Sequence, residues 1–206
     1  MRPLPRILAV TDDEIVGQAD FPIRAAAIAS AGPAIGLVVR SPAASGGQRL
    51  RSLERVRALA RPAEAATIAH GDPALGRIAG AQGVQLRTSD LSPADARRVL
   101  RDGWIGVSIH HVDEGREARD GGADYLVAGS VYRTASHPDR PARGLDWLVQ
   151  IVALGLPVFA IGGITADRLA DVKATGAYGA AAIGALWREP DPAKAADLMV
   201  REWSRE

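Results

Sequence analysis

Residues 105–131, IGVSIHHVDEGREARDGGADYLVAGSV, carry the pattern that decides the fold. An apolar run over Ile105–His110 precedes a charged segment over Val112–Asp120, and a second apolar run follows over Tyr125–Val131. Both runs are largely continuous instead of alternating strictly with polar residues, which is typical of strands that are buried on both faces of a parallel sheet. The stretch therefore predicts a strand–helix–strand unit.

The same unit recurs along the whole chain. Six further apolar runs complete the set, and successive runs begin at intervals of roughly 17 to 32 residues, which leaves room for a helix and two loops. They span Ile7–Thr11, Ile35–Arg40, Ala66–Ala69, Gly83–Arg87, Pro157–Gly163 and Ala180–Gly184. Eight strands that alternate with helical segments, with no obvious linker, predict one α/β domain over residues 1–206, a (β/α)8 TIM barrel. A doubly wound open sheet is the alternative.

Local signals indicate where several helices begin. Ser92 can cap a helix, with Pro93 at its first position. Asp72 followed by Pro73 indicates a short helix, and Thr165 is expected to cap a helix over Ala166–Thr175.

The composition excludes several classes of function. Apolar residues make up 47% of the 206 residues and charged residues 24%, as in ordinary globular proteins. A formal net charge of +1 gives no electrostatic reason to expect nucleic acid or an acidic membrane as a partner. Without cysteine the chain has no disulfide, no thiolate metal site and no cysteine nucleophile. Because no signal-peptide pattern and no membrane-length apolar run occur, we expect a cytoplasmic location.

Glycines follow the last two predicted strands. Gly162 and Gly163 stand in the stretch Ala160–Thr165, and Ile183 and Gly184 end the eighth strand. Glycine lets backbone N–H groups approach a phosphate closely, and barrels often bind phosphate at this place. The sequence therefore favours a phosphate site here over the alternative of a simple tight turn.

The loop after the sixth strand is rich in groups that bind anions or move protons. Thr134 and Ser136 supply hydroxyls, two arginines flank them, and His137 can exchange a proton near neutral pH. These residues predict a functional loop, and a solvated turn fixed by Pro138 is the alternative.

Charged residues also stand where other predicted strands end, at the rim where barrels place their chemistry. They are Asp12, Arg40, His70, Arg87, Asp90 and His110. Arg40 and His110 are the leading candidates because each ends a strongly apolar strand. Asp90 is the carboxylate best placed for Mg²⁺, whereas the histidines lack zinc-like spacing, so a metal is not expected.

An ordered set of motifs resembles the thiamine phosphate synthase/TenI superfamily over nearly the full chain. The motifs are Val10–Asp12, Val39–Arg40, Gly83–Leu86, Gly106–His110, Gly122–Tyr125, Gly129–Thr134 and Ala160–Ile164. The resemblance implies a (β/α)8 barrel that binds a thiazole phosphate. It also implies one of two activities: a synthase that joins a pyrimidine diphosphate to thiazole phosphate with Mg²⁺, or a TenI-type tautomerase that aromatises the thiazole without metal.

Departures from the synthase pattern favour the tautomerase. The usual Arg-x-Lys reads Arg40-Ser41-Pro42, the usual Asn-Asp reads His70-Gly71, and a usual lysine is replaced by His137. Fixed lysine charge and a paired carboxylate site, which a magnesium diphosphate requires, are thus largely missing. One departure argues against the tautomerase, because Ser130 stands where TenI-type members tend to carry a histidine.

The sequence therefore predicts a TenI-like thiazole tautomerase without a cofactor. His137 is the first candidate for proton transfer, with His110 or His70 second, and Arg40 would hold an anionic group. A synthase that uses Mg²⁺ is the enzyme alternative, and a regulatory relative that binds thiazole phosphate without turnover is the non-enzyme alternative. The expected partner is a small molecule, and the sequence leaves a homo-oligomer open.

Overall fold

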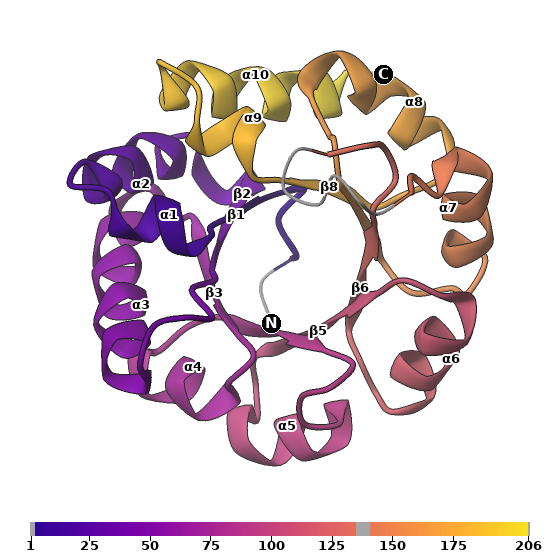
Figure 1. Cartoon of the computed structure of the whole chain (residues 1–206), viewed down its shortest axis with the longest axis horizontal. Helices are drawn as coiled ribbons and strands as arrows, with labels where there is room; N and C mark the ends of the chain where they lie inside the picture. The colour runs from indigo at the N-terminus through magenta and orange to yellow at the C-terminus, as the bar shows by residue number, and fades with distance from the viewer. Residues whose placement is uncertain (1–2, 135–140, 206) are drawn as a thin grey trace.

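The computed structural model describes residues 3–134 and 141–205. Eight parallel strands form a closed barrel in chain order, and β8 hydrogen-bonds to β1 with Ala180 opposite Ile7. This closure, seen end-on in Figure 1, confirms the (β/α)8 barrel and shows that the open-sheet alternative is wrong. The strands are β1 (Ile7–Val10), β2 (Ile35–Val39), β3 (Ala66–His70), β4 (Gly83–Arg87), β5 (Trp104–Ile109), β6 (Tyr125–Gly129), β7 (Val158–Ile161) and β8 (Gly179–Ala182).

Helices surround the ring of strands (Figure 1). They are α1 (Asp13–Gly17), α2 (Phe21–Ala29), α3 (Gly46–Ala60), α4 (Pro73–Ala79), α5 (Pro93–Leu100), α6 (Val112–Asp120), α7 (Gly144–Val152), α8 (Leu169–Ala174), α9 (Gly184–Trp187) and α10 (Pro192–Ser204), with 3₁₀ turns η1 (Gly32–Ala34), η2 (Arg61–Ala63) and η3 (Ala166–Arg168). In the part of the chain that the structure describes, no helix is long and apolar enough to span a bilayer.

Ser92 caps α5 as predicted, Asp72 caps the predicted short helix α4, and Thr165 stands at the N-cap position of η3. Ser92 Oγ accepts a hydrogen bond from the backbone N–H of Asp95 at 3.1 Å, and Asp72 Oδ1 accepts one from Ala74 at 2.9 Å. The side chain of Thr165 makes no cap hydrogen bond, and the segment after it begins as the 3₁₀ turn η3 and becomes α-helical at Leu169. The short helices α1 and α9 were not predicted.

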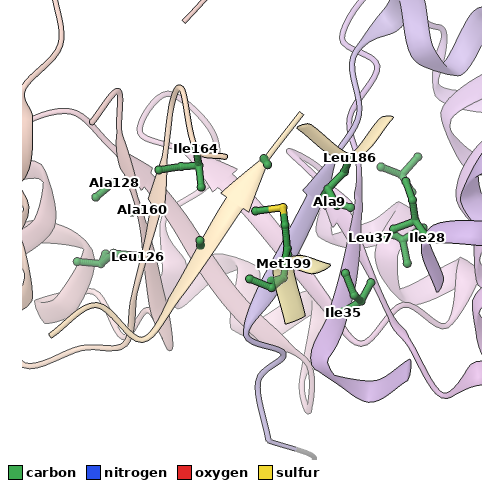
Figure 2. Packing of buried hydrophobic residues seen from close by; sticks show 14 of the residues in the cluster. Ala9, Ile28, Ile35, Leu37, Leu126, Ala128, Ala160, Ile164, Leu186 and Met199 are labelled. Atoms are coloured by element: carbon green, nitrogen blue, oxygen red, sulfur yellow. The ribbon is translucent and has the colours of Figure 1, made fainter. Parts of the chain in front are cut away.

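Alternate residues of each strand face two different cores. Ile7 and Ala9 of β1 pack outward into the layer between the barrel and its helices, whereas Leu8 and Val10 point into the barrel. Figure 2 shows part of this outer layer, in which Ala9, Leu37 and Ile28 belong to the same buried cluster as Leu186 of α9 and Met199 of α10.

Aromatic side chains fill the N-terminal half of the barrel interior. Tyr125 and Phe159 meet edge to face with ring centroids 5.3 Å apart. Gly106 and Gly179 make room for them, since a Cβ at either position would lie 2.2–2.5 Å from the facing ring. Leu4, which precedes β1, packs against the same cluster. The filled half leaves open space only toward the carboxyl ends of the strands.

Candidate active site

A cavity of about 540 Å³ lies at the carboxyl ends of the strands. Because the barrel closes in chain order, β7 and β8 lie across it from β3 and β4. Several predicted site residues line the cavity: Arg40, His70, His110, Thr134, Gly162, Gly163, Ile183 and Gly184. The structure thus gathers around one space candidates that are distant in sequence, with the glycines at the ends of β7 and β8 and with Arg40 and His70 at the ends of β2 and β3. Ser136 and His137 lie outside the described residues.

The backbone path itself requires glycine after β7. Gly162 and Gly163 have φ of +101° and +64°, in the region that favours glycine. A Cβ at Gly162 would lie 2.6 Å from Cβ of Ser130, and one at Gly163 would lie 2.4 Å from the carbonyl oxygen of Arg133. The tight turn and the close approach of the loop after β6 therefore explain both glycines without a ligand.

Gly184 differs, because packing does not explain it. The nearest atom to a Cβ built there is Nη1 of Arg188, 4.0 Å away, and the residue is the first of α9. Gly184 lines the cavity, so a Cβ there would meet no protein atom closer than 4.0 Å. Of the three glycines, Gly184 is therefore the one that neither a positive φ nor a close neighbour requires.

His110 follows β5 with its ring fixed by a hydrogen bond. Its Nδ1 lies 2.7 Å from the carbonyl oxygen of Gly129. A carbonyl can only accept, so Nδ1 carries the proton and Nε2 is the basic nitrogen of the neutral ring. Glu114 holds the backbone here by accepting from the N–H groups of His110 and His111. His110 is thus the described histidine best arranged to take a proton.

His70 ends β3 in a different environment. Burial, followed by the positive charge of Arg40, lowers its pKa from 6.5 to about 4. At neutral pH the imidazole is therefore uncharged. The neutral ring can accept or donate a hydrogen bond.

Arg40 is anchored through its backbone. Thr11 Oγ1 donates to the carbonyl of Arg40 at 2.8 Å and accepts from its N–H at 2.7 Å. No carboxylate among the described residues forms an ion pair with the Arg40 guanidinium, which lines the cavity. Its charge is thus available to an anion.

Asp90 does not face the cavity as a metal ligand would. Arg87 Nη2 donates to Asp90 Oδ1 at 2.6 Å, Arg87 Nε contacts both carboxylate oxygens at 3.2 Å, and the N–H of Arg87 donates to Oδ2 at 2.8 Å. Burial alone would raise the pKa of Asp90, but these contacts with Arg87 outweigh it and lower the pKa.

The residues present therefore do not fit Mg²⁺. Asp90 has both oxygens committed, Gly71 offers no second carboxylate, and residues 3–134 and 141–205 contain no group of three His, Cys, Asp or Glu side chains able to hold a metal.

Several cavity residues were missed at the sequence level. Arg168 donates to the carbonyl of Gly163 at 2.6 Å, and Arg188, just after α9, pairs with Asp12 at 3.0 Å and Glu14 at 2.8 Å. Arginines on or beside helices resemble solvated charges, and only the α9 turn brings Arg188 to the rim. Asp12, predicted as a rim residue, accepts from the N–H of Ile15 and so caps α1.

Comparison with known proteins identifies the family. The family model described as thiamine monophosphate synthase matches residues 7–186, which is most of the chain. The chain belongs to the thiamine monophosphate synthase/TenI family.

Relatives in this family are similar over most of their length. The thiamine-phosphate synthase of Marinobacter nauticus is 35% identical over 89% of this chain and 83% of its own. That of Methanoculleus marisnigri is 36% identical over 92% and 91%. Among solved structures, thiamine phosphate pyrophosphorylase from Pyrococcus furiosus has a TM-score of 0.83 at 30% identity, covering 97% of this chain and 95% of that one. A 3-hexulose-6-phosphate synthase, at 19% identity and a TM-score of 0.73 over 96% and 99%, shares the fold.

Family membership supports the expected link to thiamine biosynthesis. The names of these relatives favour the synthase alternative over the tautomerase that the departures at residues 40–42, 70–71 and 137 predict. The assignment of individual site residues stays a prediction.

Proposed function

We propose that this protein is a thiamine-phosphate synthase, which joins a pyrimidine diphosphate to a thiazole carboxylate phosphate, releases pyrophosphate from the pyrimidine and loses the thiazole carboxylate as carbon dioxide. One observation carries the proposal beyond the names of its relatives. The cavity lining includes glycine backbone at β7–β8 and, toward the other side of the barrel, Arg40 and Arg87 at the ends of β2 and β4, which supports two separate places suited to an anion. A tautomerase substrate has one phosphate, whereas the synthase must hold a phosphate and a diphosphate at once.

The thiazole phosphate is assigned to the glycine side. Backbone N–H groups near Gly163, Ile183 and Gly184 would donate to its oxygens, with the hydroxyl of Thr134 beside them.

The diphosphate is assigned to the side of the cavity where Arg40 and Arg87 lie. Arg40 and Arg87 reach the cavity from β2 and β4, and guanidinium groups match phosphate oxygens in pairs. As pyrophosphate departs it gains negative charge, and positive groups fixed in place beforehand stabilise that charge without rearranging. The barrel thereby holds the two reactants in one orientation, which removes most of the entropic cost of bringing them together.

One assay tests the proposal against its alternatives. The purified protein is given pyrimidine diphosphate with thiazole phosphate, and separately the unaromatised thiazole phosphate, each with Mg²⁺ and with a chelator. We expect thiamine phosphate and pyrophosphate in equal amounts.

Two results would contradict the proposal. Aromatised thiazole as the sole product would establish the tautomerase, for which His110 supplies a basic Nε2 at the cavity and His137 remains the other candidate. Binding of thiazole phosphate without turnover of either substrate set would instead identify a non-catalytic relative.

A further inference from the structure

The charges around His70 leave a positive face toward the cavity. The side chain of Asp90 is 8% exposed, whereas that of Arg87 is 57% exposed and lines the cavity. The carboxylate therefore lies behind the guanidinium. Arg40 stands on the other side of His70, because β2 and β4 flank β3. An anion that enters here meets the guanidinium groups of Arg40 and Arg87, while the carboxylate of Asp90 stays buried behind Arg87.

Arg87 keeps donors for such an anion. A guanidinium has five N–H donors in one plane. Asp90 uses those on one edge, through Nε and Nη2, which leaves Nη1 and the second N–H of Nη2. Asp90 therefore orients the group without saturating it.

The position of Gly71 shows where a second carboxylate would stand beside Asp90. A Cβ built on Gly71 would lie 3.4 Å from Oδ2 of Asp90, so a carboxylate at position 71 would stand directly beside Asp90. The family resemblance places a metal-binding aspartate at this position, and here glycine stands there with φ of +76°. A pair of carboxylates with a divalent cation has no net charge, and one carboxylate with one guanidinium has none either.

We propose that the guanidinium of Arg87, oriented by Asp90 and assisted by Arg40, takes the place of the divalent metal, so that this end of the cavity binds a diphosphate group without Mg²⁺. The identity of the ligand rests on the proposed function, but the metal-free anion site rests on the contacts of Arg87. The site binds inorganic pyrophosphate, the released product, through guanidinium donors alone.

The test is calorimetric titration of the intact protein with inorganic pyrophosphate, once with EDTA and once with excess Mg²⁺. We expect binding in EDTA, and the same or weaker binding with Mg²⁺, because free Mg²⁺ competes for the same phosphate oxygens. Arg87→Gln should weaken binding in EDTA by about 10-fold or more, since charged hydrogen bonds contribute about 1.5–3 kcal/mol.

Arg116→Gln is the matched control. Arg116 pairs with Asp113 at the same 2.6 Å, also three residues away, and its side chain is 56% exposed, but it lies on α6 away from the cavity-lining residues. This variant should bind pyrophosphate like the unaltered protein. Thermal unfolding of both variants separates loss of a binding group from loss of the fold.

The outcomes separate this inference from the proposed function. Pyrophosphate affinity that rises 10-fold or more with Mg²⁺, or equal binding by the two variants, would overturn the metal-free site even if thiamine phosphate is formed. No binding under either condition would overturn it as well. Metal-free binding that depends on Arg87, in a protein that makes no thiamine phosphate, would support the site while the proposed function fails.

Discussion

Replacing Gly184 by alanine should weaken phosphate binding without harming the fold. The added Cβ would have Arg188 Nη1, at 4.0 Å, as its nearest neighbour, so no protein atom has to move. Alanine is also the better helix former by about 1 kcal/mol in a helix interior, and by less at the first position of α9. The free energy of unfolding should therefore stay level or rise slightly.

Binding should change in the opposite direction. A methyl group that projects into the cavity keeps the phosphate from the backbone N–H groups beside it, and one hydrogen bond to a charged group contributes about 1.5–3 kcal/mol. The Kd for thiazole phosphate should then rise by about 10- to 150-fold. Calorimetric titration measures this change, and urea unfolding measures the stability.

Gly46→Ala provides the matched control. Gly46 is likewise the first residue of a helix, α3, a Cβ there would meet no atom within 4 Å, and the residue does not line the cavity. It should leave Kd unchanged. If Gly184→Ala bound thiazole phosphate as tightly as Gly46→Ala, the phosphate would not approach the backbone at Gly184 and the assignment of that end would be wrong.

Three further predictions concern stability. Gly162→Ala should lower the free energy of unfolding by about 2 kcal/mol or more, because φ is +101° and the new Cβ would lie 2.6 Å from Cβ of Ser130. An unchanged midpoint of urea unfolding would show that position 162 tolerates a side chain without strain. Burial lowers the pKa of His70 to about 4, so between pH 6.5 and 4 the unfolded chain binds a proton that the folded chain does not. The free energy of unfolding should therefore fall across this window, by at most about 3 kcal/mol. His70→Gln should flatten this pH profile of stability. Tyr125→Phe should stabilise the protein by up to about 1 kcal/mol in thermal unfolding, because its buried hydroxyl has no hydrogen-bond partner within the described residues, and a clear loss of stability would reveal a partner such as bound water.

The strands were predictable because their signal is local. The run Gly83–Arg87 and the segment Val112–Asp120 coincide with β4 and α6 to the residue. Apolar runs bounded by glycine or charged residues contain this information without reference to the rest of the chain. By contrast, α9 has four residues, GALW, that continue the apolar run of β8, so its helical turn is set by packing and not by a change in composition.

The sequence predicted which strand-end residues would meet at the rim, but it missed Arg168 and Arg188 and did not predict which side chains would pair. Arg40, His70 and His110 end strands, so the fold brings them to one rim as expected. That Arg87 turns back onto Asp90, three residues later, depends on the turn after β4, and composition does not specify that turn. The sequence indicated Asp90 only as the carboxylate best placed if Mg²⁺ were bound, and it could not show that Asp90 pairs with Arg87.

The seam between β1 and β8 determines how the chain can fold while it is being made. Ile7 cannot meet Ala180 until nearly all of the protein has left the ribosome, so β1 offers a bare strand edge throughout most of synthesis. Such edges pair readily with those of other incomplete chains. A product terminated before Gly179 retains two such edges, on β1 and β7, and has no means of closing them. Premature termination of this gene should therefore yield aggregates in place of a smaller working enzyme.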